Sequence, residues 1–127
     1  MERIIELLTE KNQFLEKFYR LNEHELVNLG EGNLDNVEYF YNTREGILTT
    51  MMKIDRMIEE SGQFVDDPSL ISDQDKRDIL RALEYKNELV TKILSQDLQI
   101  LSFIEDAKSE LIKELTHVQT ARKAFHA

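Results

Sequence analysis

Apolar residues recur every three or four positions from residue 79 to residue 125 of this chain. One row, at intervals of seven, reads Leu83, Val90, Asp97, Ile104, Leu111, Val118 and Phe125. A second row beside it reads Leu80, Asn87, Leu94, Leu101, Lys108, Leu115 and Arg122, widened by Ile79, Ile93, Ile100, Ala107 and Ala121. We call these positions the apolar stripe. A stripe of this kind lies along one side of a helix and packs on other helices. Because no glycine or proline interrupts residues 72–125, the pattern predicts one long helix there.

Two shorter helices are expected before it. The first covers residues 1–29, with its apolar positions at Ile4, Ile5, Leu8, Leu15, Phe18, Tyr19, Leu26 and Leu29. Gly30 and Gly32 end it, because a glycine just past a helix accepts the left-handed conformation that caps it. The second covers residues 33–61, with Asn33 as the N-cap, and Gly62 ends it. The short turn between the two helices predicts an antiparallel hairpin.

The segment 62–71 is the one candidate for a longer loop, and it holds the sole proline, Pro68. We expect its apolar residues to fold back over the end of the bundle: Phe64, Val65, Leu70 and Ile71. Ser72 followed by Asp75 is close to a capping box and restarts the helix. No domain boundary is visible, so residues 1–127 are interpreted as a single helical domain.

Helix lengths decide the expected architecture. Two helices of about 28 residues are each about 42 Å long, whereas residues 72–125 would extend about 80 Å. We therefore predict an all-α fold in which the antiparallel hairpin packs on the first half of the third helix, a three-helix bundle with an extended C-terminal helix. A bend between Ser95 and Ser102 would instead fold the last stretch back and give a four-helix bundle. No helix-breaking residue occurs there, which favours the continuous helix.

Composition narrows the possible functions. The 25 acidic residues exceed the 16 basic ones and give a net charge of -9, which disfavours nucleic acid and anionic membranes as partners. No apolar run approaches a membrane span and no signal-peptide block begins the chain, so we expect no membrane insertion and a cytoplasmic protein. The absence of cysteine excludes disulfides, thiolate catalysis and zinc-thiolate sites.

Enzymatic chemistry finds little support in the sequence. Glu114 and His117 form one Glu-x-x-His pair, whereas di-iron bundles need two such pairs and two further glutamates. No glycine-rich phosphate loop or nucleophile elbow occurs. We expect neither a metal, another cofactor nor a catalytic residue, and therefore not an enzyme.

Arg44 lies at an apolar position of the second helix, where an unpaired buried charge is very costly. Counting back from the turn places it opposite Phe18 to Arg20, which predicts a structural, register-setting ion pair with Glu16 or Glu23; direct contact with a bound partner is the alternative. Asp97 interrupts the apolar stripe; it either sets the register of the helices or marks where the bundle ends.

Three local patterns resemble one family. Residues 25–37 (ELVNLGEGNLDNV) hold a Gly-acidic turn followed by Leu and an acidic residue, Arg44 is followed by Ile47 and Leu48, and residues 121–125 are basic with a terminal aromatic. In these features the chain resembles flagellar type III export chaperones of the FlgN/FliT kind. Phe125 stands where tyrosine is commoner in the family, which leaves no hydroxyl group to hydrogen bond.

The resemblance implies a cytosolic chaperone that holds late flagellar structural subunits, such as hook-associated or cap proteins, before export. Such chaperones bind with an amphipathic helix near their C-terminus. The partner-binding residues expected here are Leu101, Ile104, Leu111, Leu115, Val118, Arg122 and Phe125. A homodimeric coiled-coil structural or adaptor protein would need the same exposed stripe, so the sequence leaves both functions open.

Overall fold

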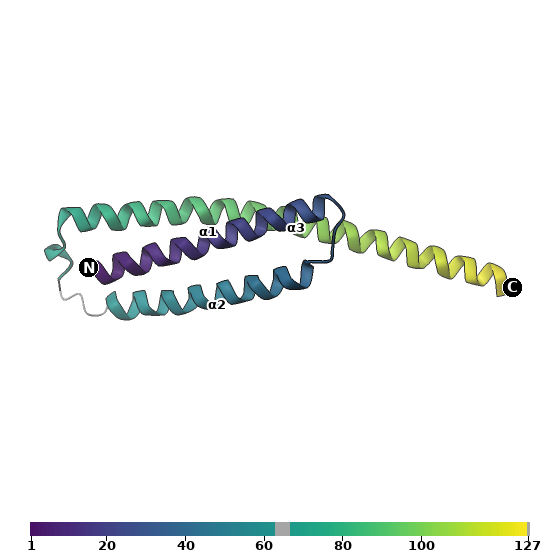
Figure 1. Cartoon of the computed structure of the whole chain (residues 1–127), viewed down its shortest axis with the longest axis horizontal. Coiled ribbons are helices and arrows are strands. Elements are labelled where there is room, and N and C mark those ends of the chain that lie inside the picture. Colours follow the sequence, from purple (N-terminus) through teal and green to yellow (C-terminus); the bar gives the residue numbers. More distant parts are fainter. Residues whose placement is uncertain (63–66, 127) are drawn as a thin grey trace.

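The computed structural model describes residues 1–62 and 67–126. It contains helices α1 (Glu2–Gly30), α2 (Val37–Gly62) and α3 (Asp73–His126), with a short 3-10 helix, η1 (Pro68–Leu70), before α3. No strand occurs among these described residues. Figure 1 shows α1 and α2 running antiparallel, with α3 alongside α1 in the same direction and continuing well past the hairpin. The predicted all-α three-helix bundle is confirmed, and α3 passes through residues 95–102 without a break, so the four-helix alternative is wrong.

The turn between α1 and α2 is longer than expected. The Asn33 side-chain oxygen accepts a hydrogen bond from the Asp35 backbone N–H (2.9 Å), so Asn33 caps a turn and not a helix. α2 consequently begins at Val37, four residues after the predicted start at residue 33. Gly32 has φ 76° and occupies the left-handed conformation, whereas Gly30 is the last residue of α1. Of the two glycines, only Gly32 is required by its backbone conformation.

The start of α3 matches the sequence prediction. The Asp75 backbone N–H donates to the Ser72 hydroxyl oxygen at 3.1 Å, which confirms the predicted cap. Leu70 is 81% exposed, so it does not fold back over the bundle as expected, and Ile71 is half-buried. The short η1 helix holds Leu70 at the surface. Phe64 and Val65 lie outside the described residues.

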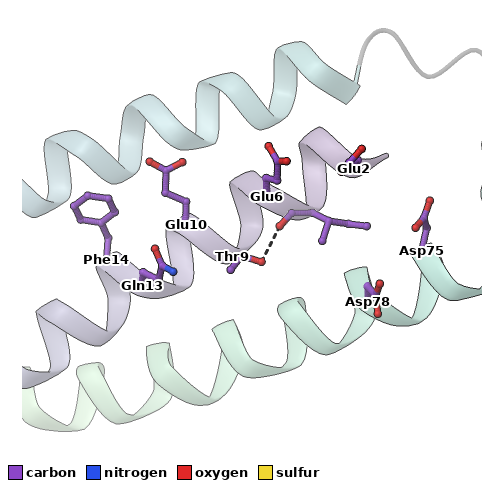
Figure 2. A pocket seen from close by; sticks show the side chains of 9 residues that line it. Glu2, Glu6, Thr9, Glu10, Gln13, Phe14, Asp75 and Asp78 are labelled. Atoms are coloured by element: carbon purple, nitrogen blue, oxygen red, sulfur yellow. Dashed lines mark hydrogen bonds between the residues drawn. The ribbon is translucent and has the colours of Figure 1, made fainter.

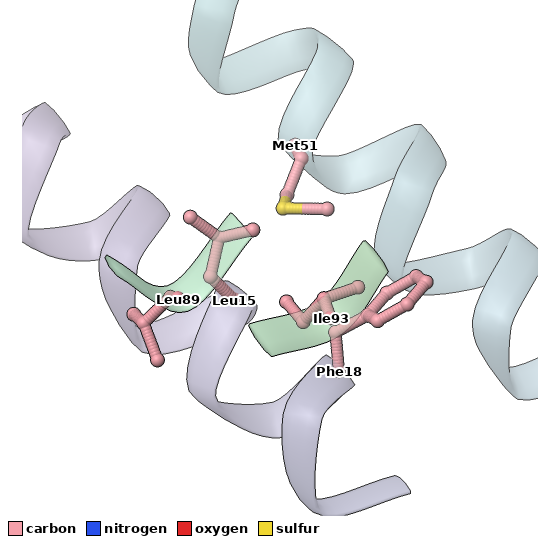
Figure 3. Packing of buried hydrophobic residues seen from close by; sticks show 5 residues of the cluster. All are labelled: Leu15, Phe18, Met51, Leu89 and Ile93. Carbon is pink, nitrogen blue, oxygen red and sulfur yellow. The ribbon is translucent and has the colours of Figure 1, made fainter. Parts of the chain in front are cut away.

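The core consists of two clusters along the bundle. The first joins all three helices through Leu15, Phe18, Met51, Leu89 and Ile93 (Figure 3). The second joins Leu29, Phe40 and Ile100, with Ile104 packed at its edge. The backbone of α1 lies close to both other helices, whereas α2 and α3 meet through long side chains such as Met51. The hairpin therefore packs on α3 as far as Ala107, about the first two-thirds of that helix and more than the predicted half, with α1 as the central helix.

The bundle ends near Ala107. That side chain is half-buried, whereas every residue from Lys108 to Thr120 is exposed. We call residues 108–126 of α3 the free segment. No other helix of the described bundle covers this segment, so a binding partner could contact it. The candidate site therefore lies on the free segment.

Candidate functional site

The side of α3 that packs on the hairpin differs from the centre of the predicted apolar stripe. The buried residues are Leu89, Ile93, Gln96 and Ile100, each between 3% and 7% exposed. The stripe's second row is outside: Leu80, Leu94 and Leu101 are 58%, 59% and 53% exposed. A row counted at 3.5 residues per turn drifts around a straight helix of 3.6 residues per turn. Leu80 and Leu94 therefore do not pack on other helices as the stripe predicted, whereas Leu101 was expected to be a partner-binding residue.

Leu89 and Gln96 were missed by the sequence reasoning. The signal that could have found this face is the spacing of four, three and four residues from Leu89 to Ile100, which follows the true helical period.

The buried face continues onto the free segment. Continuing the same spacing from Ile100 leads through Ile104 and Ala107 to Leu111 and then Val118. Ile104 still packs at the edge of the second core cluster, whereas Leu111 and Val118 are 56% and 50% exposed. The surface that holds the hairpin on α3 thus extends, unpaired, beyond the hairpin.

The other predicted partner-binding residues fall around this face. Leu115 is 54% exposed beside Leu111, and Arg122 is exposed near the tip of α3. Leu101 lies on the outer side of α3 with Leu98, which is 70% exposed. The Phe125 side chain lies outside the described residues. The structure therefore places Leu111, Leu115 and Val118 together on the free segment, and Leu101 apart from them.

A charged layer lies between the two core clusters. Arg44 donates two hydrogen bonds to the Asp97 carboxylate, at 3.0 Å to Oδ1 and 3.1 Å to Oδ2. Asn22 donates a third to Asp97 at 3.1 Å, and the Arg44 guanidinium lies 4.9 Å from the centre of the Phe18 ring. A bidentate guanidinium–carboxylate pair of this kind fixes both the distance and the orientation of the two helices. Asp97 is therefore a register-setting residue inside the bundle and does not mark its end.

The predicted partner of Arg44 is wrong. Glu16 accepts a hydrogen bond from the Tyr85 hydroxyl (2.7 Å) and pairs with Arg20 (3.5 Å), and no ion pair joins Glu23 to Arg44 among the described residues. Arg44 reaches Phe18, as counting back from the turn predicted, but its charged group passes on to α3. Only the rotation of α3 brings Asp97 within reach.

Other buried polar groups also join α1 to α3. The Asn12 and Gln96 side-chain amides donate to backbone carbonyls of Ala82 and Tyr19, at 3.0 and 3.1 Å. Glu25 is 3% exposed, and one of its carboxylate oxygens has no partner. Burial raises the pKa of Glu25, and a hydrogen bond with Asn28 offsets part of that rise. The Asn12 and Gln96 hydrogen bonds fix the register of α1 against α3, whereas Glu25 interacts within α1.

An open depression of about 840 Å³ lies near the N-terminus of α1. Figure 2 shows it lined by Glu2, Glu6 and Glu10 of α1 and by Asp75 and Asp78 of α3. No basic side chain is among its lining residues. Across the described part of the chain, no three His, Asp or Glu side chains gather as a metal would require. Within the same residues, no helix is apolar and long enough to cross a membrane.

Comparison with known proteins finds no match: no family model, no curated protein and no solved structure is similar to this chain. The support for the candidate site is therefore its exposure and its apolar residues alone.

Proposed function

We propose that this protein is a cytoplasmic export chaperone that holds a helical segment of a late flagellar structural subunit, of the hook-associated or cap kind, through the free segment of α3. The observation that carries the proposal is the apolar face of α3, which continues beyond the bundle and is exposed at Leu111, Leu115 and Val118. Exposed apolar surface of this extent commonly marks a protein-binding site. The patterns at residues 25–37, at Arg44 and at residues 121–125 support the flagellar assignment.

The chemistry of the face suits an amphipathic helix as the bound segment. A partner helix can lay its own apolar side along a row of leucine, isoleucine and valine without any covalent step. Burying one such side chain contributes about 1.5–3 kcal/mol, against an association cost of about 4–15 kcal/mol. Most of the stripe from Ile104 to Val118 must therefore be engaged for useful affinity.

Binding to defined subunits tests the proposal. The full chain is titrated with purified hook-associated and cap subunits encoded by the same genome, and with variants of those subunits that lack the C-terminal helical region. We expect binding that requires this region. The double variant L111E/L115E should weaken binding at least about 100-fold, since two buried charges cost well over 3 kcal/mol.

A matched control is available on the opposite side of the free segment. Ser109 and Thr116 are exposed and face away from Leu111 and Leu115, so S109E/T116E adds the same charge without touching the stripe. This control should bind normally, and both variants should keep the thermal stability of the bundle. Normal binding by L111E/L115E, or unfolding of the whole protein, would remove the main support for the proposal. Stable self-association with no affinity for any subunit would favour a coiled-coil structural protein instead.

A further inference from the structure

The hairpin end beside α3 carries negative charge that the chain itself does not neutralise. The last turn of α1 contains no basic residue, so the partial negative charge of its final carbonyl groups is uncompensated. Glu31, Asp35 and Glu38 are exposed at this end, and none of them joins an ion pair among the described residues. This end therefore favours an incoming cation.

The matching cations lie at the far tip of α3. Arg122 and Lys123 are exposed and make no ion pair within the described part of the chain. They follow Ile104, the last residue packed on the second core cluster, by about 28 Å of helix. Because α3 is continuous, these two residues cannot reach the hairpin end of their own chain.

An apolar face connects the two charged ends. It begins where Ile104 leaves the hairpin and runs through Leu111, Leu115 and Val118. Two apolar side chains at the hairpin end, Val27 and Leu34, are also 59% and 50% exposed. The acidic end, the apolar row and the basic tip thus follow one another along the length of the molecule.

We propose that the free segment pairs with the free segment of a second copy of this chain, antiparallel about a two-fold axis near Lys113. In this register Leu111 lies opposite Leu115 of the second copy. The basic tip of each copy then reaches Ile104 and the acidic hairpin end of the other.

The antiparallel arrangement follows from the positions of the charged ends and from the size of the three-helix bundles. In an antiparallel two-fold pair the basic tip of each copy meets the acidic hairpin end of the other. The same contact is therefore made twice, and all four charged ends find a partner. A parallel pair would place Arg122 beside Arg122 and both three-helix bundles at the same end. The overlap from Ile104 to Arg122 is about 27 Å, or five turns of helix. This pairing belongs to the free chain and does not depend on which subunit the protein binds.

Sedimentation of the full chain over a range of concentrations tests the pairing. We expect a reversible dimer. R122E/K123E and E31K/D35K should each weaken it at least about tenfold, and the combination of all four changes should restore it, because charge complementarity is rebuilt. K76E/R77E reverses two exposed basic residues at the other end of α3 and should leave the dimer unchanged.

Orientation has its own readout, since the chain contains no cysteine and accepts single labels cleanly. Along the helix axis, spin labels at S102C in the two copies should be offset by about 33 Å and labels at T116C by about 9 Å. The measured distance should therefore be clearly longer at S102C than at T116C. Equal, short separations at both positions would show a parallel pair and overturn the proposal. A chain that stays monomeric at about 1 mM would overturn it as well, and so would a dimer that ignores the charge reversals.

Discussion

At the scale of single residues, the bundle depends on one ion pair placed among apolar side chains. Arg44 and Asp97 are each 25% exposed, and each has additional support, from the Phe18 ring and from the Asn22 amide. A pair of this kind contributes less to stability than to specificity, because both charges lose water when they are buried. Its geometry is satisfied only when α1, α2 and α3 are all correctly placed.

Removing one partner of this pair should expose that dependence. Arg44→Ala leaves Asp97 partly buried without its cation and should lower the free energy of unfolding by about 1–3 kcal/mol, less than for a fully buried pair because water still reaches both groups. Urea unfolding measures the change. The double variant R44M/D97L should be less destabilised than Arg44→Ala alone. A loss of less than about 0.5 kcal/mol in Arg44→Ala would show that the pair is solvated in solution.

Glu25 should make stability depend on pH. Burial raises the pKa of its carboxyl group in the folded protein, so folding favours the protonated form. Its effect on stability is therefore most favourable below the ordinary pKa of 4.5 and is lost as the pH rises through the folded-state value. Glu25→Gln should raise the melting temperature at pH 7, with the difference from the wild type shrinking towards pH 4.5. A difference that is constant with pH would contradict this explanation.

At the scale of elements, neighbouring apolar residues of α3 lie on opposite sides of the bundle boundary, one buried and the next exposed. Ile100 is 3% exposed within the second core cluster, whereas Leu101 is 53% exposed on the outer side. Both residues belong to the apolar stripe of the sequence, and only packing against α1 and α2 separates them. The outer leucines are consequently free of any role in holding the bundle together.

Alanine substitutions at these two adjacent positions test this assignment. Ile100→Ala should cost about 2–5 kcal/mol, because it removes a buried side chain and leaves a cavity. Leu101→Ala should change stability by no more than about 0.5 kcal/mol, as at other surface sites. Chemical unfolding of the two variants under identical conditions gives the comparison. Equal losses at both positions would mean that α3 is rotated relative to this description.

At the scale of the whole molecule, the protein divides into a packed bundle and an unpaired helical extension. The described side chains of the free segment make no contribution to either core cluster. A helix without tertiary packing owes its order to its own propensity and to whatever binds it. Stability and partner binding are therefore expected to reside in different parts of the chain.

Truncation after residue 107 separates the two parts. The shortened chain should unfold within a few degrees of the full-length melting temperature, because no described side chain beyond Ala107 is buried. It should lose entirely the binding to flagellar subunits that we propose for the full chain. Thermal denaturation followed by circular dichroism, together with the subunit titration, measures both. A bundle that unfolds after this truncation would place structural contacts in the free segment.

Sequence alone determined the three helices and their approximate lengths, although α2 begins four residues later than predicted. Periodicity, the Ser72 cap and the glycines near residues 30–32 act between residues that are neighbours in the chain, so their effects can be worked out locally. The excess length of the third helix over the hairpin followed from counting, and with it the uncovered C-terminal face at Leu111, Leu115 and Val118.

Tertiary structure decided which residues meet across helices. The rotation of α3 buried Leu89 and Gln96 and exposed Leu94, and it gave Arg44 the carboxylate of Asp97 in place of Glu16 or Glu23. A rotation of one residue, about 100°, changes every such contact while leaving the local pattern intact. Its value is set by the simultaneous packing of three helices, which no short stretch of sequence contains.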